Sequence, residues 1–357
     1  MALNLVLAEN LRAIKRIIDR FPRIKDVFEA SCADLVALGL EENKARVLAS
    51  PNILDQAAEE IESCRKKNYF ILTMEEEGYP HYLREVFDPP IVLYGAGQVE
   101  VLKGPAVSIV GARQSSPYGR AVAVKLARDL ASRGVVVVSG MARGIDSAAH
   151  TGALKEGRTA AVLGSGLDWI YPRENRSLFG RIIEKGSVIS EFHLGSSPAG
   201  FHFPIRNRII SGLSHALVVV EATKRSGSLI SARLALEQNR EVMAVPGNVT
   251  SEYSEGCNWL IKSGAKPVTS WQDVAEEFPS PLREKLLSQE ERREKKPAMN
   301  AQERRVFEIL KPDALIHIDD LVEKSHFSVS EALSVLLSLE LKGLASQTPG
   351  KYFQRSW

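Results

Sequence analysis

The sequence predicts an α/β protein whose main domain is a doubly wound, mostly parallel sheet. Between residues 105 and 278, apolar β-branched runs alternate with amphipathic helical stretches, as in parallel sheets whose strands are connected by helices. The runs at 135–138 and 217–220 are apolar without interruption, which indicates strands covered on both faces. Ligands of such sheets bind outside the carboxyl ends of the strands, so the loops after these strands are the expected site.

Length and composition are those of an ordinary soluble protein with two or three modules. The chain has 357 residues, of which 44% are hydrophobic and 25% charged. Because the net charge is only +2, any affinity for anions must come from local clusters of cations. The three cysteines form no C-x-x-C pair, which argues against a disulfide framework or a zinc site. No apolar stretch approaches 18 residues and no secretory signal is present, so we expect a cytoplasmic protein without a membrane segment.

Residues 1–65 are expected to form a small helical domain. Leu11, Ile14 and Ile17 recur at helical spacing, and the pattern continues through 35–47. The segment 21–48 is similar to small helical modules, of the SAM or helix-hairpin-helix kind, that often contact the DNA backbone. We favour the other interpretation, a cap that packs on the main domain. The main domain, 66–278, begins with a connector that carries expected strands at 69–73 and 91–95.

Two regions follow the main domain. Residues 279–298 combine prolines with dense mixed charge, which predicts a solvated linker. Residues 299–357 show three helical patterns, a capping box from Ser328 to Glu331, and a hairpin around Pro349-Gly350. This order predicts a winged-helix-like domain. Its third helix offers few cations, mainly Lys342, so protein docking or packing is at least as good an interpretation as DNA reading.

Four strand ends of the main domain lead into loops of glycine, serine and a cation, at 106–120, 135–150, 160–175 and 216–233. Such loops place backbone N–H groups and Arg or Lys where a phosphate can sit. In the first loop Gly111 permits a tight turn, Arg113 supplies a cation, and Gly119 opens a helix whose N-terminal amides would favour an anion. In the fourth loop, cations precede a nest of small residues at a helix start, formed by Ser226, Gly227 and Ser228.

The region 201–233 is locally basic. It holds five Lys or Arg residues against the single acid Glu221, as expected of a polyanion site. The alternative for Arg206 and Arg208 is that they are buried partners of acids. Tyr171, Phe201 and Phe203 lie near these cations in sequence, where they either stack on the bases of a single strand or belong to the core.

No catalytic motif accompanies the loops. The chain lacks G-x-G-x-x-G, the P-loop, G-x-S-x-G and H-E-x-x-H patterns, so the sequence predicts no catalytic residue, no metal and no cofactor. Asp146 is interpreted as a helix N-cap, although an acid–base or metal pair with His150 is conceivable. Glu191 and Glu221 each end an expected strand and are interpreted as partners of neighbouring arginines.

Together these segments resemble the DNA-processing protein A family (DprA, also called Smf). The resemblance runs through SIVGARQSSPYG, SGMARGIDSAAH, AVLGSGLDWIYPREN, FPIRNRIISGLS, VVEATKRSGSLISARLALEQNREVMAVPG and GCNWLIKSGA. It covers about half of the chain, from roughly 105 to 267, and the motifs occur in the family's order. The helical N-terminal segment and the winged-helix-like tail also fit the family's three-part layout.

The resemblance implies an extended Rossmann-like fold that binds single-stranded DNA without strong sequence preference. It also implies a homodimer, with 258–268 near its interface, that loads the recombinase RecA on incoming DNA for homologous recombination during natural transformation, in competent cells. The implied phosphate contacts are Arg113, Arg143, Arg173, Arg206, Arg208 and Lys224, with hydrogen bonds from Ser226, Gly227 and Ser228. The glycines implied to allow close approach are Gly111, Gly140, Gly144, Gly164 and Gly166.

A nucleotide-processing enzyme is the alternative function. The related Rossmann-like phosphoribohydrolases have P-G-G-x-G-T followed closely by a glutamate. This chain has Ile230 and Ser231 where the glutamate would be needed, and it lacks the glycine pair. The sequence therefore favours a binding protein without turnover.

Overall fold

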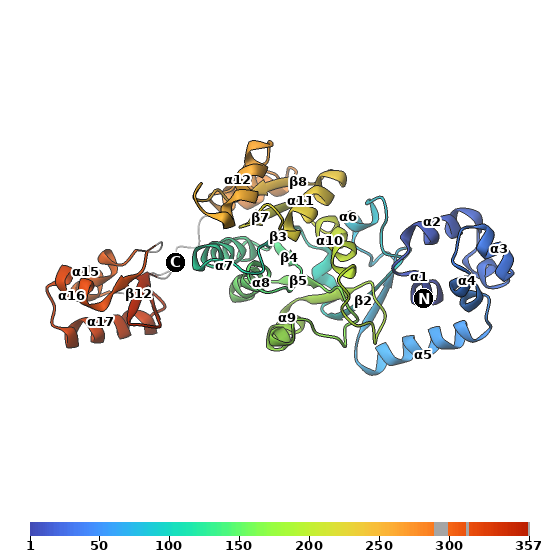
Figure 1. Cartoon of the computed structure of the whole chain (residues 1–357), viewed down its shortest axis with the longest axis horizontal. Coiled ribbons are helices and arrows are strands. Elements are labelled where there is room, and N and C mark those ends of the chain that lie inside the picture. The colour runs from blue at the N-terminus through green and yellow to red at the C-terminus, as the bar shows by residue number, and fades with distance from the viewer. Residues whose placement is uncertain (289–298, 312–313, 356–357) are drawn as a thin grey trace. The chain divides into compact units, whose positions relative to one another are not determined.

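The computed structural model describes residues 1–288, 299–311 and 314–355. These residues form two compact units, 1–286 and 287–357 (Figure 1). The first unit contains the helical N-terminal segment and the sheet, and the second contains the C-terminal helices and hairpin.

One sheet of nine strands organises residues 1–286, in the order β1-β2-β6-β5-β4-β3-β7-β8-β9. β2 pairs antiparallel with both β1 and β6, and all other pairs are parallel. The chain runs outward from β3 to β6 and then returns to the other side of β3 as β7, so the predicted doubly wound sheet is confirmed. The strands are β1 Phe70–Thr73, β2 Val92–Gly97, β3 Ala106–Gly111, β4 Val136–Ser139, β5 Thr159–Val162, β6 Ser187–Ser190, β7 Ala216–Val220, β8 Glu241–Ala244 and β9 Lys266–Pro267.

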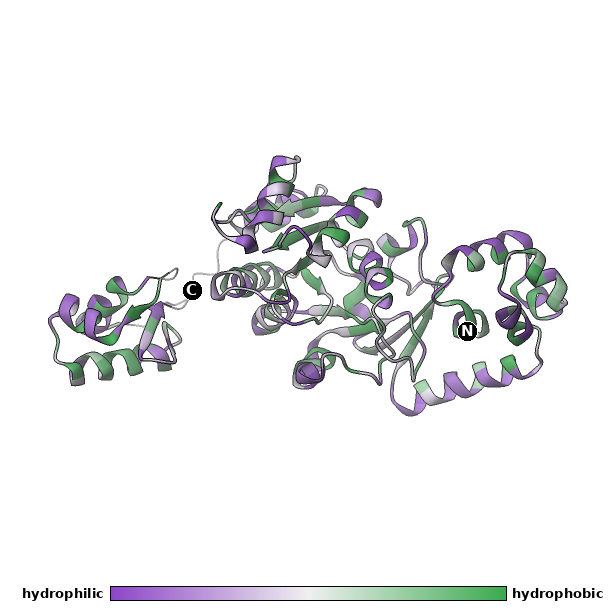
Figure 2. Ribbon diagram, in the orientation of Figure 1, coloured by the Kyte–Doolittle hydropathy of each residue, from purple (hydrophilic) through white to green (hydrophobic). Residues whose placement is uncertain are grey.

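Successive strand residues point to opposite faces of the sheet, and helices cover both faces. Ile109 and its neighbour Val218 belong to one buried cluster, whereas the next pair, Val110 and Val219, belongs to another. This explains the uninterrupted apolar runs, and Figure 2 shows the central strands as mostly hydrophobic ribbon. The first face carries α7 Pro117–Ala131, α8 Ile145–Glu156, α9 Arg176–Lys185, α13 Trp271–Ala275 and α14 Leu282–Ser288. The second carries α6 His81–Arg84, α10 His202–Gly212, α11 Gly227–Glu237 and α12 Glu255–Lys262.

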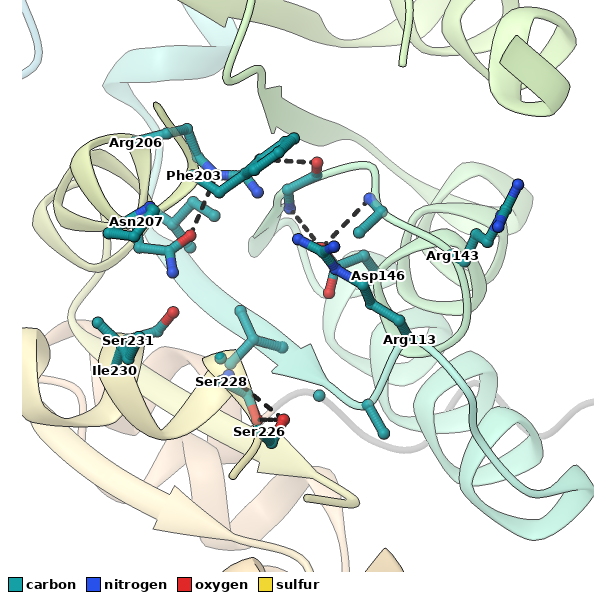
Figure 3. Close-up of a pocket in the computed structure, with 18 of the residues that line it drawn as sticks. Arg113, Arg143, Asp146, Phe203, Arg206, Asn207, Ser226, Ser228, Ile230 and Ser231 are labelled. Atoms are coloured by element: carbon teal, nitrogen blue, oxygen red, sulfur yellow. Dashed lines mark hydrogen bonds between the residues drawn. The ribbon is translucent and has the colours of Figure 1, made fainter. Parts of the chain in front are cut away.

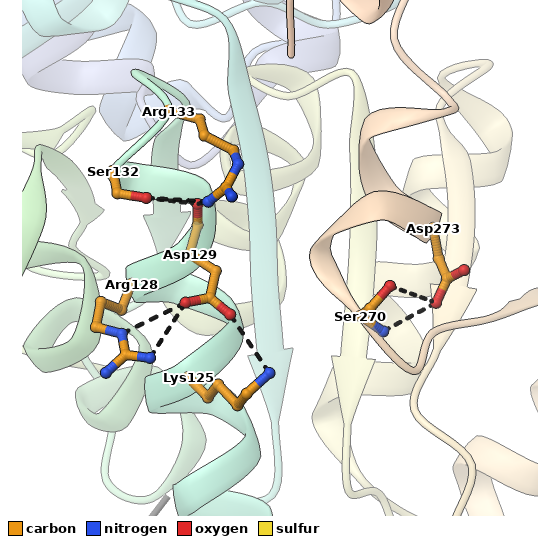
Figure 4. Close-up of polar contacts among 7 residues, drawn as sticks. All are labelled: Lys125, Arg128, Asp129, Ser132, Arg133, Ser270 and Asp273. Atoms are coloured by element: carbon orange, nitrogen blue, oxygen red, sulfur yellow. Dashed lines mark hydrogen bonds and ion pairs between the residues drawn. The ribbon is translucent and has the colours of Figure 1, made fainter. Parts of the chain in front are cut away.

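The end of this unit is anchored on α7. The guanidinium of Arg133 lies over the buried Trp271 ring, with its Cζ 3.6 Å from the ring centroid. A capping box between Ser270 and Asp273 starts α13 (Figure 4). Leu286 of α14 is buried in the same apolar cluster, whereas most residues of the expected linker from 279 to 288 are exposed. The rest of that linker, 289–298, lies outside the described residues.

The N-terminal helices are α1 Ala2–Leu7, α2 Leu11–Arg20, α3 Cys32–Ala37, α4 Glu42–Leu48 and α5 Asn52–Lys66. Side chains from α1 to α4 form their own apolar cluster. The Asn4 amide donates to the Glu191 carbonyl at 2.8 Å, and Glu9 contacts the His202 ring at 2.8 Å. These contacts hold the helices against β6 and α10, as expected of a packing cap.

The second unit is a winged helix, as predicted. It contains α15 Ala301–Ile309, β10 Ile316–His317, α16 Ile318–Ser325, α17 Val329–Leu341, β11 Ala345–Thr348 and β12 Tyr352–Arg355. The three strands pair antiparallel in the order β10-β12-β11, and the predicted capping box of Ser328 and Glu331 is present. Lys342 at the end of α17 is held by the buried Glu303 at 2.6 Å.

The outer face of α17 is apolar. Exposed side chains repeat every four residues along it, at Val329, Leu333, Leu337 and Leu341, so they share one face of the helix. This helix occupies the place of the third helix of the module, and the face it presents is unsuited to phosphates. None of the helices in the described ranges is long and apolar enough to cross a membrane.

Candidate nucleic-acid interface

A cleft of about 780 Å³ opens at the carboxyl ends of β3, β4 and β7. It lies at the point where the strand order reverses, which is where doubly wound sheets bind ligands. Its walls include Gly140. They also include Arg113, Phe203, Arg206, Ser226 and Ser228, which Figure 3 labels. All four predicted loops thus reach one site, the third through Tyr171 and Pro172.

Two glycines let the loops after β3 and β4 approach each other. A Cβ at Gly111 would overlap the carbonyl oxygen of Val220, and one at Gly144 would overlap the carbonyl oxygens of Ala112 and Arg113. Gly144 also has a φ of +72°, which an L side chain rarely adopts. Gly111 lines the cleft, whereas Gly144 is not one of its lining residues.

Arg113 is the exposed cation of the inner cleft. Its Cζ lies 5.1 Å from the centroid of the Phe203 ring, within the range of a cation–π contact. The ring of Tyr171, 47% exposed, lies 5.8 Å from the same ring. One guanidinium and two aromatic rings therefore border the same opening.

Arg206 lines the floor of the cleft but is committed to the backbone. It is only 4% exposed. Its guanidinium donates to the Gly140 carbonyl at 2.7 Å and to the carbonyl of Val162. Burial lowers its pKa to about 10, so it remains a cation at neutral pH. We interpret its role as holding two strand ends together while adding positive charge beneath the cleft.

Arg208 lies away from the cleft and corrects the prediction that both arginines contact phosphate. It is 3% exposed and pairs with Glu191, with Asp88 at 3.6 Å. Burial raises the pKa of Glu191 to about 7, and the charge of Arg208 opposes that rise. The guanidinium is buried beside two carboxyl groups and cannot reach DNA, so the alternative, a buried ion pair, describes it.

The N-terminus of α11 opens into the cleft. Ser226 is its N-cap, accepting from the Ser228 amide at 3.4 Å, and the two hydroxyls lie 2.8 Å apart. Gly227 is exposed, and a Cβ placed there would meet no atom within 4 Å. Because the positive end of a helix attracts anions, this nest is the best phosphate seat in the cleft.

Two of the predicted cations are exposed in loops that border the cleft, each beside a glutamate. Arg143 donates to Glu174 at 2.8 and 2.7 Å, and Lys224, 74% exposed, lies 3.3 Å from Glu255. The hydrogen bond from Arg143 lowers the pKa of Glu174. Arg143 lines the cleft edge (Figure 3), whereas Lys224 does not line it. Both pairs are exposed, and such pairs are weak.

The third predicted loop contributes less than the other three. Arg173 is exposed but does not line the cleft. A Cβ at Gly164 would press on the Phe203 ring, and one at Gly166 would overlap the His193 carbonyl oxygen. These two glycines therefore make room for neighbouring chain segments, not for a ligand in the cleft.

Glu221 occupies the helix start that was expected to attract an anion. The Ser116 amide donates to its Oε2 at 2.8 Å, and the Ser116 hydroxyl donates to its Oε1. The interpretation of Glu221 as a partner of arginine is wrong, whereas that of Glu191 is confirmed. The sequence could not reveal this contact, since 105 residues separate the two partners.

The pair of Asp146 and His150 is structural. Asp146 is the second residue of α8, not its N-cap, and it accepts from the amides of Gly140 and Ala142 at 3.2 and 3.3 Å. His150 is buried against the Thr159 hydroxyl at 2.7 Å, and burial lowers its pKa to about 3. Across the described ranges, no group of three or more His, Cys, Asp or Glu residues could hold a metal ion.

Sequence reasoning missed several polar residues that line the cleft. They are Gln114, Asn207, Thr223, Ser231 and Tyr253. Asn207 accepts from the Arg206 guanidinium at 3.1 Å. Its place between two arginines was a usable signal, whereas Tyr253 comes from a distant segment that no local pattern connects to the cleft.

The chain matches two family models. Residues 70–279 match that of DNA recombination-mediator protein A, and residues 290–351 match the DprA winged helix domain. The first match covers the whole sheet with its cleft, and the second covers the C-terminal unit.

Two curated proteins of this kind are similar to the chain in sequence. The chain is 46% identical to DNA processing protein DprA of Streptococcus pneumoniae over 57% of this chain and 72% of that protein. It is 39% identical to protein Smf of Escherichia coli over 80% of this chain and 77% of that protein.

Two solved structures have a similar fold. An X-ray structure of DprA from Streptococcus pneumoniae aligns with a TM-score of 0.68 at 36% identity, covering 78% of this chain and 96% of that one. A structure of DNA processing protein A from Helicobacter pylori, described in terms of its single-stranded DNA binding mode, aligns with a TM-score of 0.53 at 33% identity. It covers 58% of this chain and 93% of that one.

Proposed function

Because the chain belongs to the DNA recombination-mediator protein A family, we propose that it binds single-stranded DNA without strong sequence preference. We further propose that it delivers incoming DNA to RecA during natural transformation, as a mediator without turnover. The Helicobacter pylori relative, whose structure concerns single-stranded DNA binding, supports the choice of ligand.

The cleft carries this proposal. It combines an open helix N-terminus at Ser226 to Ser228 with the exposed guanidinium of Arg113. Arg143 adds positive charge at the edge of the cleft, and Lys224 adds it next to the lining residue Thr223. Several cations suit the phosphates of a polymer better than the single phosphate of a mononucleotide.

The chemistry of these groups accounts for the absence of sequence preference. Backbone amides, serine hydroxyls and guanidinium groups recognise phosphate oxygens, which are the same at every nucleotide. Tyr171 and Phe203 border the opening, and exposed Phe201 precedes Phe203 in the chain. Rings of this kind stack on any base, since every base has a π-face.

The polar groups that face the cleft support binding without turnover. The carboxylate of Asp146 is engaged by two backbone amides, which leaves it poorly placed to accept a proton from a substrate. Ile230 and Ser231 line the position where a phosphoribohydrolase would need a glutamate. The walls thus offer donors and rings, not an acid–base pair.

We also propose that the protein is a homodimer through the edge of the sheet near α12. β9 is the outermost strand, and Trp259 on α12 is 57% exposed. An exposed tryptophan and an outermost strand are both suited to association. Light scattering should show a dimer for the parent chain and a smaller mass for Trp259→Arg, whereas an unchanged mass would rule out this surface.

The test of the proposed function is DNA binding with and without RecA. Fluorescence anisotropy should show tight, salt-sensitive binding to single strands of several sequences and weaker binding to duplex. Adding the protein should shorten the lag of RecA assembly on single strands. Equal binding to duplex and single strands would contradict the ligand, and an unchanged lag would contradict the mediator role.

A further inference from the structure

Glu221 fills the place where a doubly wound sheet ordinarily holds a phosphate. A turn joins the parallel strand β3 to α7. In dinucleotide-binding folds, the helix N-terminus at such a turn receives the pyrophosphate. Here the Glu221 carboxylate accepts from the Ser116 amide at 2.8 Å and from the Ser116 hydroxyl. A negative group of this chain thus stands where a ligand's negative group would stand.

Most first-turn amides of α7 already have hydrogen-bond partners next to this carboxylate. The Gly119 amide donates to the Ser116 hydroxyl oxygen at 3.0 Å, and the Arg120 amide donates to the Ser116 carbonyl at 3.2 Å. Pro117, the first residue of the helix, has no amide hydrogen. Of the first-turn amides, only that of Tyr118 remains for another anion.

The chain is shaped to hold Glu221 there. Its φ of +58° is rare for a residue other than glycine, and this conformation turns the end of β7 toward α7. Its carbonyl accepts from the Ala112 amide at 2.8 Å, which fixes the backbone. A Cβ at Gly119 would overlap the Glu221 carboxylate, so the glycine provides the space. Glu221 as a whole is 7% exposed.

We propose that Glu221 is a specificity-determining residue that acts as an internal anion and closes the α7 seat to nucleotides and inorganic phosphate. The N-terminus of α11, with Gly227 open to solvent, stays available to a phosphate at this crevice. The crevice then accepts a backbone phosphate at α11 but not the pyrophosphate of a dinucleotide at α7. This inference goes beyond the proposed function because it concerns a second, occluded anion site.

The test is phosphate binding by variants of the whole chain. Glu221→Gly suits the positive φ and removes the carboxylate, whereas Glu221→Gln keeps a neutral side chain of the same shape in the seat. Isothermal titration with inorganic phosphate at low ionic strength should show an affinity about tenfold higher for Glu221→Gly than for the parent. Glu221→Gln should stay within about twofold of the parent, since its amide still fills the seat.

A second measurement locates the phosphate. In the Arg113→Ala background, which weakens the other seat, the gain from Glu221→Gly should persist, and the amide resonances of Tyr118 and Gly119 should shift on titration. A gain that vanishes in this background, or equals that of Glu221→Gln, overturns the proposal, as does a folded Glu221→Gly without gain. If Glu221→Gly does not fold, Glu221→Asn replaces it, because asparagine tolerates this φ and is too short to reach Ser116.

Discussion

The guanidinium of Arg113 lies over the Phe203 ring, 5.1 Å from its centroid, and joins the loop after β3 to the start of α10. Arg206 approaches the same ring at 5.9 Å. Within the described residues Arg113 has no carboxylate partner, unlike Arg143 and Lys224. Arg113 can therefore bind a phosphate without first breaking an ion pair, unlike Arg143 and Lys224.

Arg113→Glu should weaken binding to all single strands alike by about tenfold or more, since a charge-assisted hydrogen bond is worth about 1.5–3 kcal/mol. Anisotropy titrations with several oligonucleotides of equal length measure this. Arg181→Glu, which makes the same charge change at an exposed position on α9, is the matched control and should change the affinity far less. Equal effects of the two variants would remove Arg113 from the site.

Glu174→Gln should strengthen DNA binding because it frees Arg143 from its carboxylate partner. The gain should reach no more than about fivefold, since exposed pairs contribute about 0.2–1 kcal/mol. Glu62→Gln breaks a similar exposed pair with Arg65 on α5 and should have little effect. Weaker binding by Glu174→Gln would mean that Arg143 needs Glu174 to stay in place.

Gly227→Glu should weaken single-strand binding about tenfold or more, because it puts a negative side chain at the open start of α11. Gly227→Ala adds only a methyl group, which meets nothing within 4 Å, and should bind nearly as the parent does. Circular dichroism should show both variants folded. Unaltered binding by folded Gly227→Glu would contradict a phosphate seat at this helix.

His150 should make the protein less stable in acid. Burial lowers its pKa to about 3, so the neutral ring is favoured in the folded state, and stability present above pH 6.5 is lost as the pH falls toward 3. Between pH 7 and 5 this group lowers the free energy of unfolding by about 2 kcal/mol, because pH 5 lies about 1.5 units below the pKa of about 6.5 that histidine has in the unfolded chain. Urea titrations of the parent and His150→Asn at both pH values measure it, and parallel losses would contradict the assignment.

Leu337→Lys should leave DNA binding within about twofold of the parent, as for ordinary surface substitutions. The exposed face of α17 is a row of apolar side chains, and Lys342 is held by Glu303. Titrations with single strands and duplex check this. A marked change in duplex binding would indicate that the winged helix reads DNA through α17.

The sequence predicted the sheet and the winged helix because both follow from local patterns. Uninterrupted apolar runs predict strands covered on both faces, and the capping box at Ser328 is a signal within four residues. The loops with Arg113 and Ser226 were found in the same way, since a glycine, small residues and a cation follow each strand directly.

The arrangement of the charged residues could not be predicted from the sequence. Arg206 and Arg208 are two residues apart on α10, so one faces the cleft floor while the other faces Glu191. Glu221 looked like a partner of arginine, but the turn of its backbone directs it to Ser116. Such outcomes depend on which elements pack together and on a single backbone angle, and neither leaves a local pattern.

The salt dependence of single-strand binding tests the central claim most directly. The logarithm of the affinity for an oligonucleotide is measured against the logarithm of the salt concentration, for the parent and for the combined variant Arg113→Ala, Arg143→Ala, Lys224→Ala. If these side chains contact phosphates, the slope should fall by about 2, at about 0.7 for each lost contact with a single strand. A folded combined variant that keeps the parent's slope and affinity would contradict a DNA site in this cleft.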